Sequence, residues 1–271
     1  MKIRMIAAFS LLPLLLVVLL ALPPVWTMVL VGLMAAVAAY ELLWGTGLVK
    51  HIRLVAYTAV MGFLVSAWSF WGMGYVWFLL GILLFSVILF AEVLVSHGKL
   101  PFAQIAVCIV GGLLIPYLLT SLVRIRCVEQ GRALVLIPFV VAFLSDSGAY
   151  FAGRFFGKNK LAPVISPNKT VEGMIGGVLT GIIGMVIFCL VLQLGFDFQI
   201  NYAYAVAYGL TGSLAGVFGD LAFSAIKRQT GIKDYGNLIP GHGGVLDRFD
   251  SMVIVAPLVE ALLILMPVAV K

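Results

Sequence analysis

Charged residues are scarce in this chain. Only 10% of its 271 residues are Asp, Glu, Lys or Arg, 63% are hydrophobic, and the mean hydropathy is +1.18. Soluble domains carry about a quarter charged residues, so this composition excludes a soluble globular protein. Residues 5–40 hold no charge at all. As one helix they would extend roughly 54 Å, nearly twice the hydrocarbon thickness of a bilayer, so they predict two membrane spans separated at Pro23-Pro24.

Cysteine is rare, and the common catalytic signatures are missing. Cys108, Cys127 and Cys189 lie in or near apolar runs without paired spacing, which favours small hydrophobic side chains over disulfides or a metal site. The sequence contains no Walker loop, dinucleotide-binding fingerprint or Gly-x-Ser-x-Gly elbow. The N-terminus has the basic and apolar regions of a signal peptide, but no cleavage site follows, so we expect a retained first helix.

Long apolar segments make up most of the chain. They predict an all-α, polytopic integral membrane protein with a single membrane domain, 1–271, in which 1–132 forms N-terminal helical spans and 133–271 carries catalytic helices and cytoplasmic loops. Basic residues concentrate in alternate loops, and the positive-inside rule therefore places the N-terminus in the cytoplasm. Because this charge flanks membrane helices, we expect no nucleic-acid partner. About nine spans are predicted, at residues 5–22, 25–44, 54–72, 75–95, 101–121, 133–153, 173–195, 202–228 and 251–270.

Polar residues gather in the second half. Two long inner loops, 154–172 and 229–250, are rich in cations and in glycine or proline. Asp146 and Asp220 lie in otherwise apolar helices, where an aspartate at mid-bilayer costs about 2.5–3.5 kcal/mol on insertion scales. Each should therefore face a partner or a wet cavity. In the first half, the residues near helix ends are interpreted as interfacial or snorkelling side chains: Glu41, Glu92 and His97.

Glycines recur at every fourth position on two of the predicted helices. Gly212, Gly216 and Asp220 share one stripe on the eighth span, and a matching stripe on the seventh comprises Gly173, Gly177 and Gly181. Small residues at this spacing let helix backbones approach closely. We therefore predict that Asp220 faces protein and not lipid.

The residue types on these loops favour phosphate chemistry. Carboxylates without histidine or cysteine clusters favour a hard cation such as Mg²⁺ over zinc. Lysines and arginines beside glycine-rich turns suit polyphosphate, because bare backbone N–H groups can approach anionic oxygens. In "ISPNKT", Ser166 is expected to cap a helix that starts at Pro167, and its N-terminus would favour an anion. The pattern thus indicates Mg²⁺ and phosphates at the inner membrane surface.

Two stretches carry a family resemblance. "SAIKRQTGIKDYGNLIPGHGGVLDRFD", residues 224–250, resembles the signature of phosphatidate cytidylyltransferases, also called CDP-diglyceride synthetases. "DSGAYFAGRFFGKNKLAPVISPNKTVEG", residues 146–173, is also similar to that family. The resemblance covers roughly the last 140 residues, whereas the first 130 match only as hydrophobic spans. The signature positions matched are Ser224, Lys227, Arg228, Lys233, Asp234, Pro240, His242, Gly243, Gly244, Asp247, Arg248 and Asp250.

The resemblance implies a reaction and roles for particular residues. CTP and phosphatidic acid would give CDP-diacylglycerol and pyrophosphate, with Mg²⁺ as cofactor and a second cation compatible with the site. The implied metal ligands are Asp220 and Asp247, with Asp146 and Asp250 as secondary catalytic carboxylates. The implied binding residues for CTP or lipid phosphates are Lys169, Lys227, Arg228, Lys233 and Arg248. His242 with Gly243 and Gly244 would shape the turn, while Ser166 and Asn168 are weaker binding candidates. Asp234 is a signature position whose alternative role is that of an ordinary surface acid paired with Lys233 or Arg228.

Other interpretations stay open at this level. A polyprenol kinase or an archaeal-lipid cytidylyltransferase would also use CTP at a membrane. An ion-coupled transporter would use Asp146 and Asp220 as an ion pathway. Against the transporter, the sequence shows no inverted repeat, and its polar residues cluster on one side of the membrane. CTP, phosphatidic acid and membrane lipids are the expected partners in the plasma membrane, with the active site facing the cytoplasm. A homodimer is compatible with the sequence, which leaves the oligomeric state open.

Overall fold

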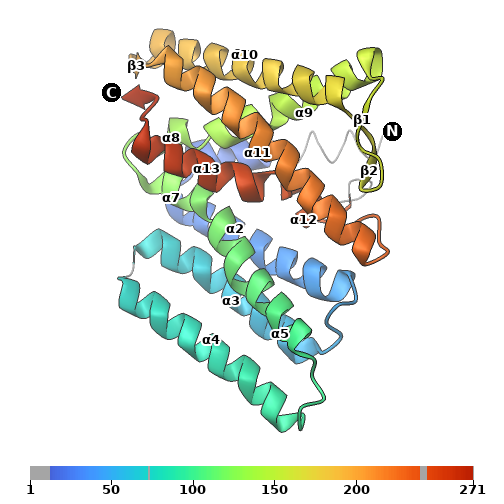
Figure 1. Cartoon of the computed structure of the whole chain (residues 1–271). Helices are drawn as coiled ribbons and strands as arrows, with labels where there is room; N and C mark the ends of the chain where they lie inside the picture. The colour runs from blue at the N-terminus through green and yellow to red at the C-terminus, as the bar shows by residue number, and fades with distance from the viewer. Residues whose placement is uncertain (1–12, 73, 239–242, 271) are drawn as a thin grey trace. The chain divides into compact units, whose positions relative to one another are not determined.

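Helices dominate the computed structural model, which describes residues 13–72, 74–238 and 243–270 (Figure 1). Seven helical stretches in these residues are long and apolar enough to cross a membrane. This confirms the prediction of an all-α, polytopic membrane protein. The seven stretches correspond to the second through eighth predicted spans and comprise Pro24–Gly45, Ile52–Trp71, Tyr75–Val95, Phe102–Cys127, Gly131–Phe156, Val171–Phe196 and Tyr202–Gln229.

The first and last predicted spans are not among these seven. The span at 5–22 lies partly outside the described residues, and its described end includes the π-helix η1 (Val17–Ala21). The last span corresponds to α13 (Met252–Leu265), whose 14 residues are fewer than the roughly 20 that a spanning helix needs. The count of nine spans and the cytoplasmic N-terminus therefore stay predictions.

The chain forms two compact units, each made from two separate parts of the sequence. The first unit combines residues 1–127 with the segment 229–248, and the second combines residues 128–228 with 249–271. The glycine-rich segment 229–248 thus belongs with the N-terminal helices. The predicted division of a single domain at residue 132 did not include this grouping.

In the first unit, α2 (Pro24–Tyr40) packs along α3 (Ile52–Trp71). The helix α2 begins at a proline, which needs no hydrogen-bond partner in the first turn. It continues directly into the π-helix η2 (Glu41–Gly45). A 2.9 Å hydrogen bond from Ser66 Oγ to the Met28 carbonyl oxygen joins the two long helices. The unit also contains α4 (Tyr75–Val95), α5 (Phe102–Ile109), η3 (Val110–Leu114), α6 (Ile115–Leu119), α7 (Ser121–Cys127) and most of α12 (Leu246–Phe249).

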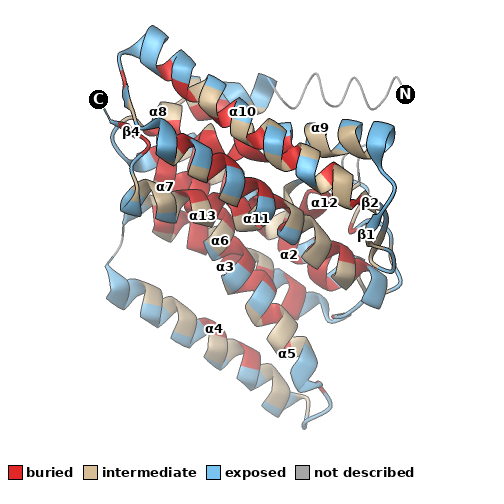
Figure 2. Cartoon of the chain, turned by 45° about the horizontal axis from the view of Figure 1, so that its top comes forward, coloured by how far each residue is buried: buried red, intermediate tan, exposed pale blue. Residues whose placement is uncertain are grey.

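The helix α4 is the least buried of the seven candidate spans. Of its residues only Phe85 and Leu89 are buried, and it is drawn mostly in the colours of exposed and intermediate residues (Figure 2). Its exposed side chains are nevertheless overwhelmingly apolar. An apolar surface of this kind is what a helix in contact with lipid presents.

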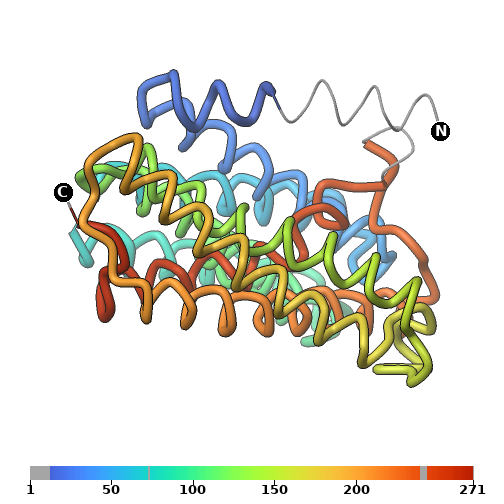
Figure 3. Tube along the Cα trace, turned by 90° about the horizontal axis from the view of Figure 1, so that it is seen from above, coloured from blue at the N-terminus to red at the C-terminus, as the bar shows by residue number. Residues whose placement is uncertain are grey.

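Among the described residues, the second unit contains five helices and two short strand pairs. Figure 3 follows α10 (Val171–Phe196) and α11 (Tyr202–Gln229), which run back in roughly opposite directions and come into contact where Gly209 meets Ile182. The other helices are α8 (Gly131–Leu134), α9 (Ile137–Phe156) and α13. A hairpin of β1 (Lys160–Ala162) and β2 (Ser166–Thr170) joins α9 to α10, and β3 (Gln199–Ile200) pairs with β4 (Ala269–Val270).

Glycines provide the close contacts between these helices. A Cβ atom on Gly177 would lie 2.8 Å from the Ser145 carbonyl oxygen on α9, and one on Gly212 would lie 2.7 Å from a Val141 methyl. A Cβ atom on Gly216 would lie 3.6 Å from Val255 on α13. The predicted small-residue stripes are therefore helix contact surfaces, as expected from their spacing. Larger side chains at the first two positions would force the helices apart.

Candidate active site

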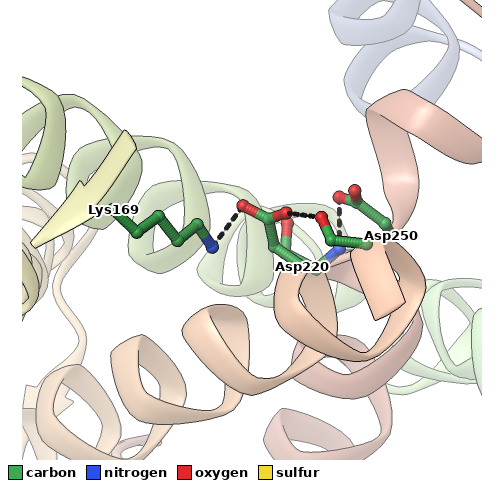
Figure 4. A network of polar contacts seen from close by, with 5 residues as sticks. Lys169, Asp220 and Asp250 are labelled. Carbon is green, nitrogen blue, oxygen red and sulfur yellow. Dashed lines mark hydrogen bonds and ion pairs between the residues drawn. The ribbon is translucent and has the colours of Figure 1, made fainter. Parts of the chain in front are cut away.

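A lysine on the β1–β2 hairpin pairs with an aspartate on α11. Lys169 Nζ lies 2.5 Å from Asp220 Oδ2, and both side chains are only partly exposed (Figure 4). Asp220 Oδ1 accepts a 3.1 Å hydrogen bond from Ser224 Oγ, one helical turn later. Asp220 therefore faces protein, as its place on the glycine stripe predicted. The hairpin positions Lys169 because its strands are paired from Lys160 opposite Thr170.

The predicted helix start at Ser166 is wrong. Residues 166–170 form strand β2, and α10 begins only at Val171. Pro167 suits a strand of a two-stranded hairpin, where a missing N–H is tolerated. The helix cap is Thr170, whose Oγ1 accepts a 3.1 Å hydrogen bond from the Gly173 N–H.

The first turn of α10 carries an acid of its own. Glu172 accepts hydrogen bonds from the backbone N–H groups of Lys158 and Asn159, at 3.1 and 3.2 Å. The Asn159 side chain donates a further bond of 2.8 Å to the same carboxylate. This carboxylate closes the hairpin back onto the start of the helix, so the anion near this helix start is supplied by the protein itself.

Asp250 lies close to the Lys169–Asp220 pair (Figure 4). It occupies the turn before α13, is 9% exposed, and accepts a 2.7 Å hydrogen bond from the Ser251 N–H. Burial, followed by the negative charge of Asp220, raises the pKa of Asp250 from 3.8 to about 7. The charge of Asp146 on α9 raises this pKa further, although the Asp146 side chain belongs to an exposed residue. The charges of Asp220 and Asp146 thus both act on the buried carboxyl group of Asp250.

Cations occupy the end of α11. Lys227 is 9% exposed, and its positive charge lowers the pKa of Asp250 against the larger effect of burial. Arg228 is exposed, and its Nε donates a 3.1 Å hydrogen bond to the Ile165 carbonyl oxygen. This bond ties the helix end to the hairpin that carries Lys169. The other two predicted hairpin residues, Ser166 and Asn168, are half-buried and exposed, respectively.

In the first unit, Asp247 closes the glycine-rich segment on itself. The residue is 7% exposed, and its Oδ2 accepts hydrogen bonds from the N–H groups of Tyr235, at 2.7 Å, and Gly244, at 3.0 Å. Gly243 has a φ of +87°, in the left-handed region that favours glycine, and a Cβ there would lie 2.9 Å from the same Oδ2. The carboxylate therefore organises the turn that precedes it.

Sequence reasoning missed Glu41. Its interpretation as an interfacial or snorkelling side chain is wrong, because Glu41 is 2% exposed and accepts hydrogen bonds from the N–H groups of Val245 and Leu246. A carboxylate following a long uncharged helix was the available signal, since an ionisable residue within a membrane span is expected to have a partner.

The other predicted site residues of the segment 229–248 are either exposed or lie outside the residues that the structure describes. Lys233, Asp234 and Arg248 are exposed, and none of their side chains belongs to the hydrogen-bonded turn described above. His242 lies outside the described residues.

The carboxylates of the second unit suit a hard divalent cation. Asp220 and Asp250 lie near enough to each other for the charge of the first to raise the pKa of the second, and a cation relieves such repulsion. Within the described ranges, no three His, Cys, Asp or Glu side chains converge on one point that could hold a metal. Mg²⁺ commonly uses one or two protein carboxylates and completes its shell with water and substrate phosphates, so a pair of carboxylates is sufficient.

The fold and these residues define a class: a polytopic membrane protein whose acids and cations are suited to binding metal-bound phosphates. Comparison with known proteins supports this class. The profile of the cytidylyltransferase family matches residues 2–266. This match spans nearly the whole chain, and the chain belongs to the cytidylyltransferase family.

Curated relatives carry a more specific name. A Bacillus subtilis (strain 168) protein named phosphatidate cytidylyltransferase is 36% identical over 251 residues, which are 88% of each chain. A Staphylococcus epidermidis protein of the same name is 38% identical over 184 residues, or 68% of each chain. One from Staphylococcus aureus (strain COL) is 46% identical over 136 residues, which cover 50% of this chain and 51% of the relative.

Proposed function

We propose that this protein transfers a cytidylyl group from CTP to phosphatidic acid, giving CDP-diacylglycerol and pyrophosphate. A phosphate oxygen of phosphatidic acid forms a bond to the α-phosphorus of CTP, and the bond from that phosphorus to the bridging oxygen of pyrophosphate breaks. The observation that carries this proposal is the family match over residues 2–266, with relatives named for this activity at 36–46% identity.

The residues support the chemistry that this reaction needs. The phosphomonoester of phosphatidic acid is already largely anionic at neutral pH, so little general-base help is required. The difficulty is to hold two polyanions in line, which cations accomplish by binding and by stabilising charge in the transition state. Lys169 and Lys227 lie beside the Asp220–Asp250 pair. They supply this charge, together with Arg228, Lys233 and Arg248 from the family signature.

Mg²⁺ is the cofactor of the proposed reaction. When bound, it supplies positive charge that neutralises the transferring phosphoryl group and orients its oxygens. Asp220 and Asp250 would hold it in the second unit, because the pair provides hard oxygen ligands and a repulsion that a cation relieves. The family signature implies Asp247 of the first unit as the metal ligand alongside Asp220, with Asp250 as a secondary carboxylate. A second cation is compatible with this proposal and is not required by it.

The site is proposed to face the cytoplasm of a plasma-membrane protein. The support is the charge distribution, because basic residues favour the cytoplasmic side. The loop around Lys169 also carries Arg154, Lys158 and Lys160, and the end of α11 with the segment after it carries Lys227, Arg228, Lys233 and Arg248. CTP is a cytoplasmic nucleotide, so this orientation brings the charged segments to the substrate. A homodimer is compatible with the proposal and is not required by it.

Radiolabelled CTP tests the reaction against its nearest rival. The purified protein is incubated with phosphatidic acid, Mg²⁺ and CTP labelled at either the α- or the γ-phosphate. A cytidylyltransferase moves the α-label into lipid and releases the γ-label as pyrophosphate. A CTP-dependent kinase moves the γ-label into lipid. Lipid labelled only from the γ-phosphate, or no labelled lipid at all, would refute the proposed function.

A further inference from the structure

Glu41 is the most buried acidic residue in the described part of the chain, and both its oxygens are used. It is the first residue of η2, where α2 gives way to a π-helix. Oε1 accepts a 2.9 Å hydrogen bond from the Val245 N–H, and Oε2 accepts a 2.8 Å bond from the Leu246 N–H. The carboxylate therefore accepts hydrogen bonds from two consecutive backbone N–H groups of the segment 229–248, which belongs to the same compact unit.

Two glycines of that segment lie directly against this carboxylate. The three nearest atoms to a Cβ on Gly244 would all belong to the Glu41 carboxylate, and a Cβ on Gly236 would lie 2.6 Å from Glu41 Oε1. Neither glycine has a positive φ, so backbone freedom does not explain them. Gly45, at the other end of η2, likewise leaves room for the Tyr235 carbonyl oxygen. The π-helix and the segment thus fit each other at several points, and π-helical turns in proteins are frequently found at functional sites.

The two residues bound by Glu41 immediately precede Asp247 in the chain. Leu246, whose N–H is bound by Glu41, immediately precedes Asp247, whose own Oδ2 binds the Tyr235 and Gly244 N–H groups. The turn is therefore held by two carboxylates, one supplied by the N-terminal helices and one by the segment itself. Loss of either leaves buried backbone donors without acceptors, which is costly in a water-poor setting.

We propose that Glu41 is a positioning residue for the transfer reaction: it fixes the turn that carries Asp247 and Arg248. This inference rests on the proposed function, and it gives the N-terminal spans a role in it. Glu41 does not need to touch a substrate. Its effect is exerted through the orientation of the following carboxylate and guanidinium, because small misplacements of charged groups have large effects on transition-state stabilisation.

The main test is Glu41→Gln, which keeps the size of the side chain. A glutamine offers one acceptor oxygen, and its NH₂ group would face an N–H donor, so one of the two backbone bonds is lost. We expect kcat to fall by about tenfold or more, with a smaller change in the KM for CTP and a lower melting temperature in detergent, because one buried backbone donor loses its acceptor. Glu41→Asp keeps both acceptors on a shorter side chain and should recover part of the rate. Glu92→Gln is the matched control, because Glu92 contacts Tyr57 and Arg53 instead of the segment.

A double-mutant cycle isolates the contact itself. Gly244→Ala should be damaging because its methyl group meets the Glu41 carboxylate. Once Glu41→Ala has removed that carboxylate, adding Gly244→Ala should cost little more, so the two losses in kcat should be far from multiplicative. Multiplicative losses would show that Gly244 is needed for a reason unrelated to Glu41 and would overturn the packing argument. If Glu41→Gln fails to insert, Gly244→Ala alone still tests the contact, because it keeps the Glu41 carboxylate.

Hydrogen exchange separates this proposal from the proposed function. In Glu41→Gln, whichever of the Val245 and Leu246 amides loses its acceptor should exchange about tenfold faster or more, with no change in Glu92→Gln. Unchanged exchange would refute the hydrogen bonds from the Val245 and Leu246 amides to Glu41. Faster exchange with wild-type kcat, in a protein that makes CDP-diacylglycerol, refutes the positioning role. If the wild-type protein makes no CDP-diacylglycerol, the proposed function fails and this role fails with it, while exchange still decides whether the contact exists.

Discussion

Lys169 Nζ lies 2.5 Å from Asp220 Oδ2, so a proposed phosphate-binding cation and a proposed metal-binding acid are each other's partners. The Lys169 ammonium lies beside the Asp220 carboxylate, whose negative charge acts on the buried Asp250. This pairing implies an exchange of partners during the proposed reaction. Phosphate would draw Lys169 away, and Mg²⁺ would take its place on Asp220.

Lys169→Met tests this exchange. Loss of the cation should lower kcat/KM for CTP by about 10- to 100-fold, because a charge that stabilises phosphate is missing. Loss of a competitor for Asp220 should also lower the Mg²⁺ concentration that gives the half-maximal rate. Lys160→Met, on an exposed residue of the same hairpin, is the control and should change neither quantity. Wild-type kcat/KM in Lys169→Met would contradict the prediction.

Asp220 and Asp247 are predicted to act as metal ligands that share one divalent cation. Asp220→Asn and Asp247→Asn are nearly isosteric but remove the charge that a hard cation needs. Each should lower kcat on the order of 10²-fold or more. The double variant should be little worse than either single one, because residues that act as a unit are non-additive.

The measurement is turnover across a Mg²⁺ titration for both single variants and the double variant. Asp234→Asn is the control, since Asp234 is exposed in the same segment as Asp247 and is also explained as an ordinary surface acid. Near-normal turnover in either single variant, or strictly multiplicative losses in the double variant, would rule out a shared metal. Normal turnover in Asp234→Asn would show that this exposed acid does not contribute to the reaction.

The raised pKa of Asp250 predicts that the stability of the protein depends on pH. Burial and the neighbouring charges raise its pKa from 3.8 to about 7, so between these values the folded protein binds more protons than the unfolded chain. The free energy of unfolding contributed by Asp250 therefore falls as the pH rises from about 4 through 7. In EDTA, Asp250→Asn should melt at a higher temperature than the wild type at pH 8, with a smaller difference at pH 5. Equal melting temperatures at pH 8 would refute this prediction.

Single cysteines test the orientation of the loops. Lys158→Cys and Asn237→Cys should be protected from an impermeant thiol reagent in intact cells, and Glu129→Cys should react. All three positions are exposed, and the background has Cys108, Cys127 and Cys189 replaced. Gly236 is avoided because a side chain there would meet Glu41. Labelling of Lys158→Cys or Asn237→Cys from outside would reverse the proposed topology.

Much of this protein follows from local sequence patterns. Seven of the predicted spans agree with observed helices, because an uninterrupted apolar run of about 20 residues has few alternatives in a membrane. The glycine repeat at Gly212 and Gly216 predicted a helix contact, because residues four apart share a helix face. The family signature identified the chemistry, since its charged residues stand out against an apolar chain.

Tertiary structure decided the features that depend on distant partners. Ser166 belongs to a strand because Ala162 pairs with it in a hairpin, although its sequence suits a helix cap. Lys169 and Asp220 satisfy each other, although the sequence assigned them to a phosphate and a metal. Glu41 looked like an interfacial acid because its hydrogen-bond partner Val245 lies 204 positions away. A helical pattern reports neighbours three or four residues apart, whereas a buried carboxylate is stabilised by whichever backbone donors the completed fold brings to it.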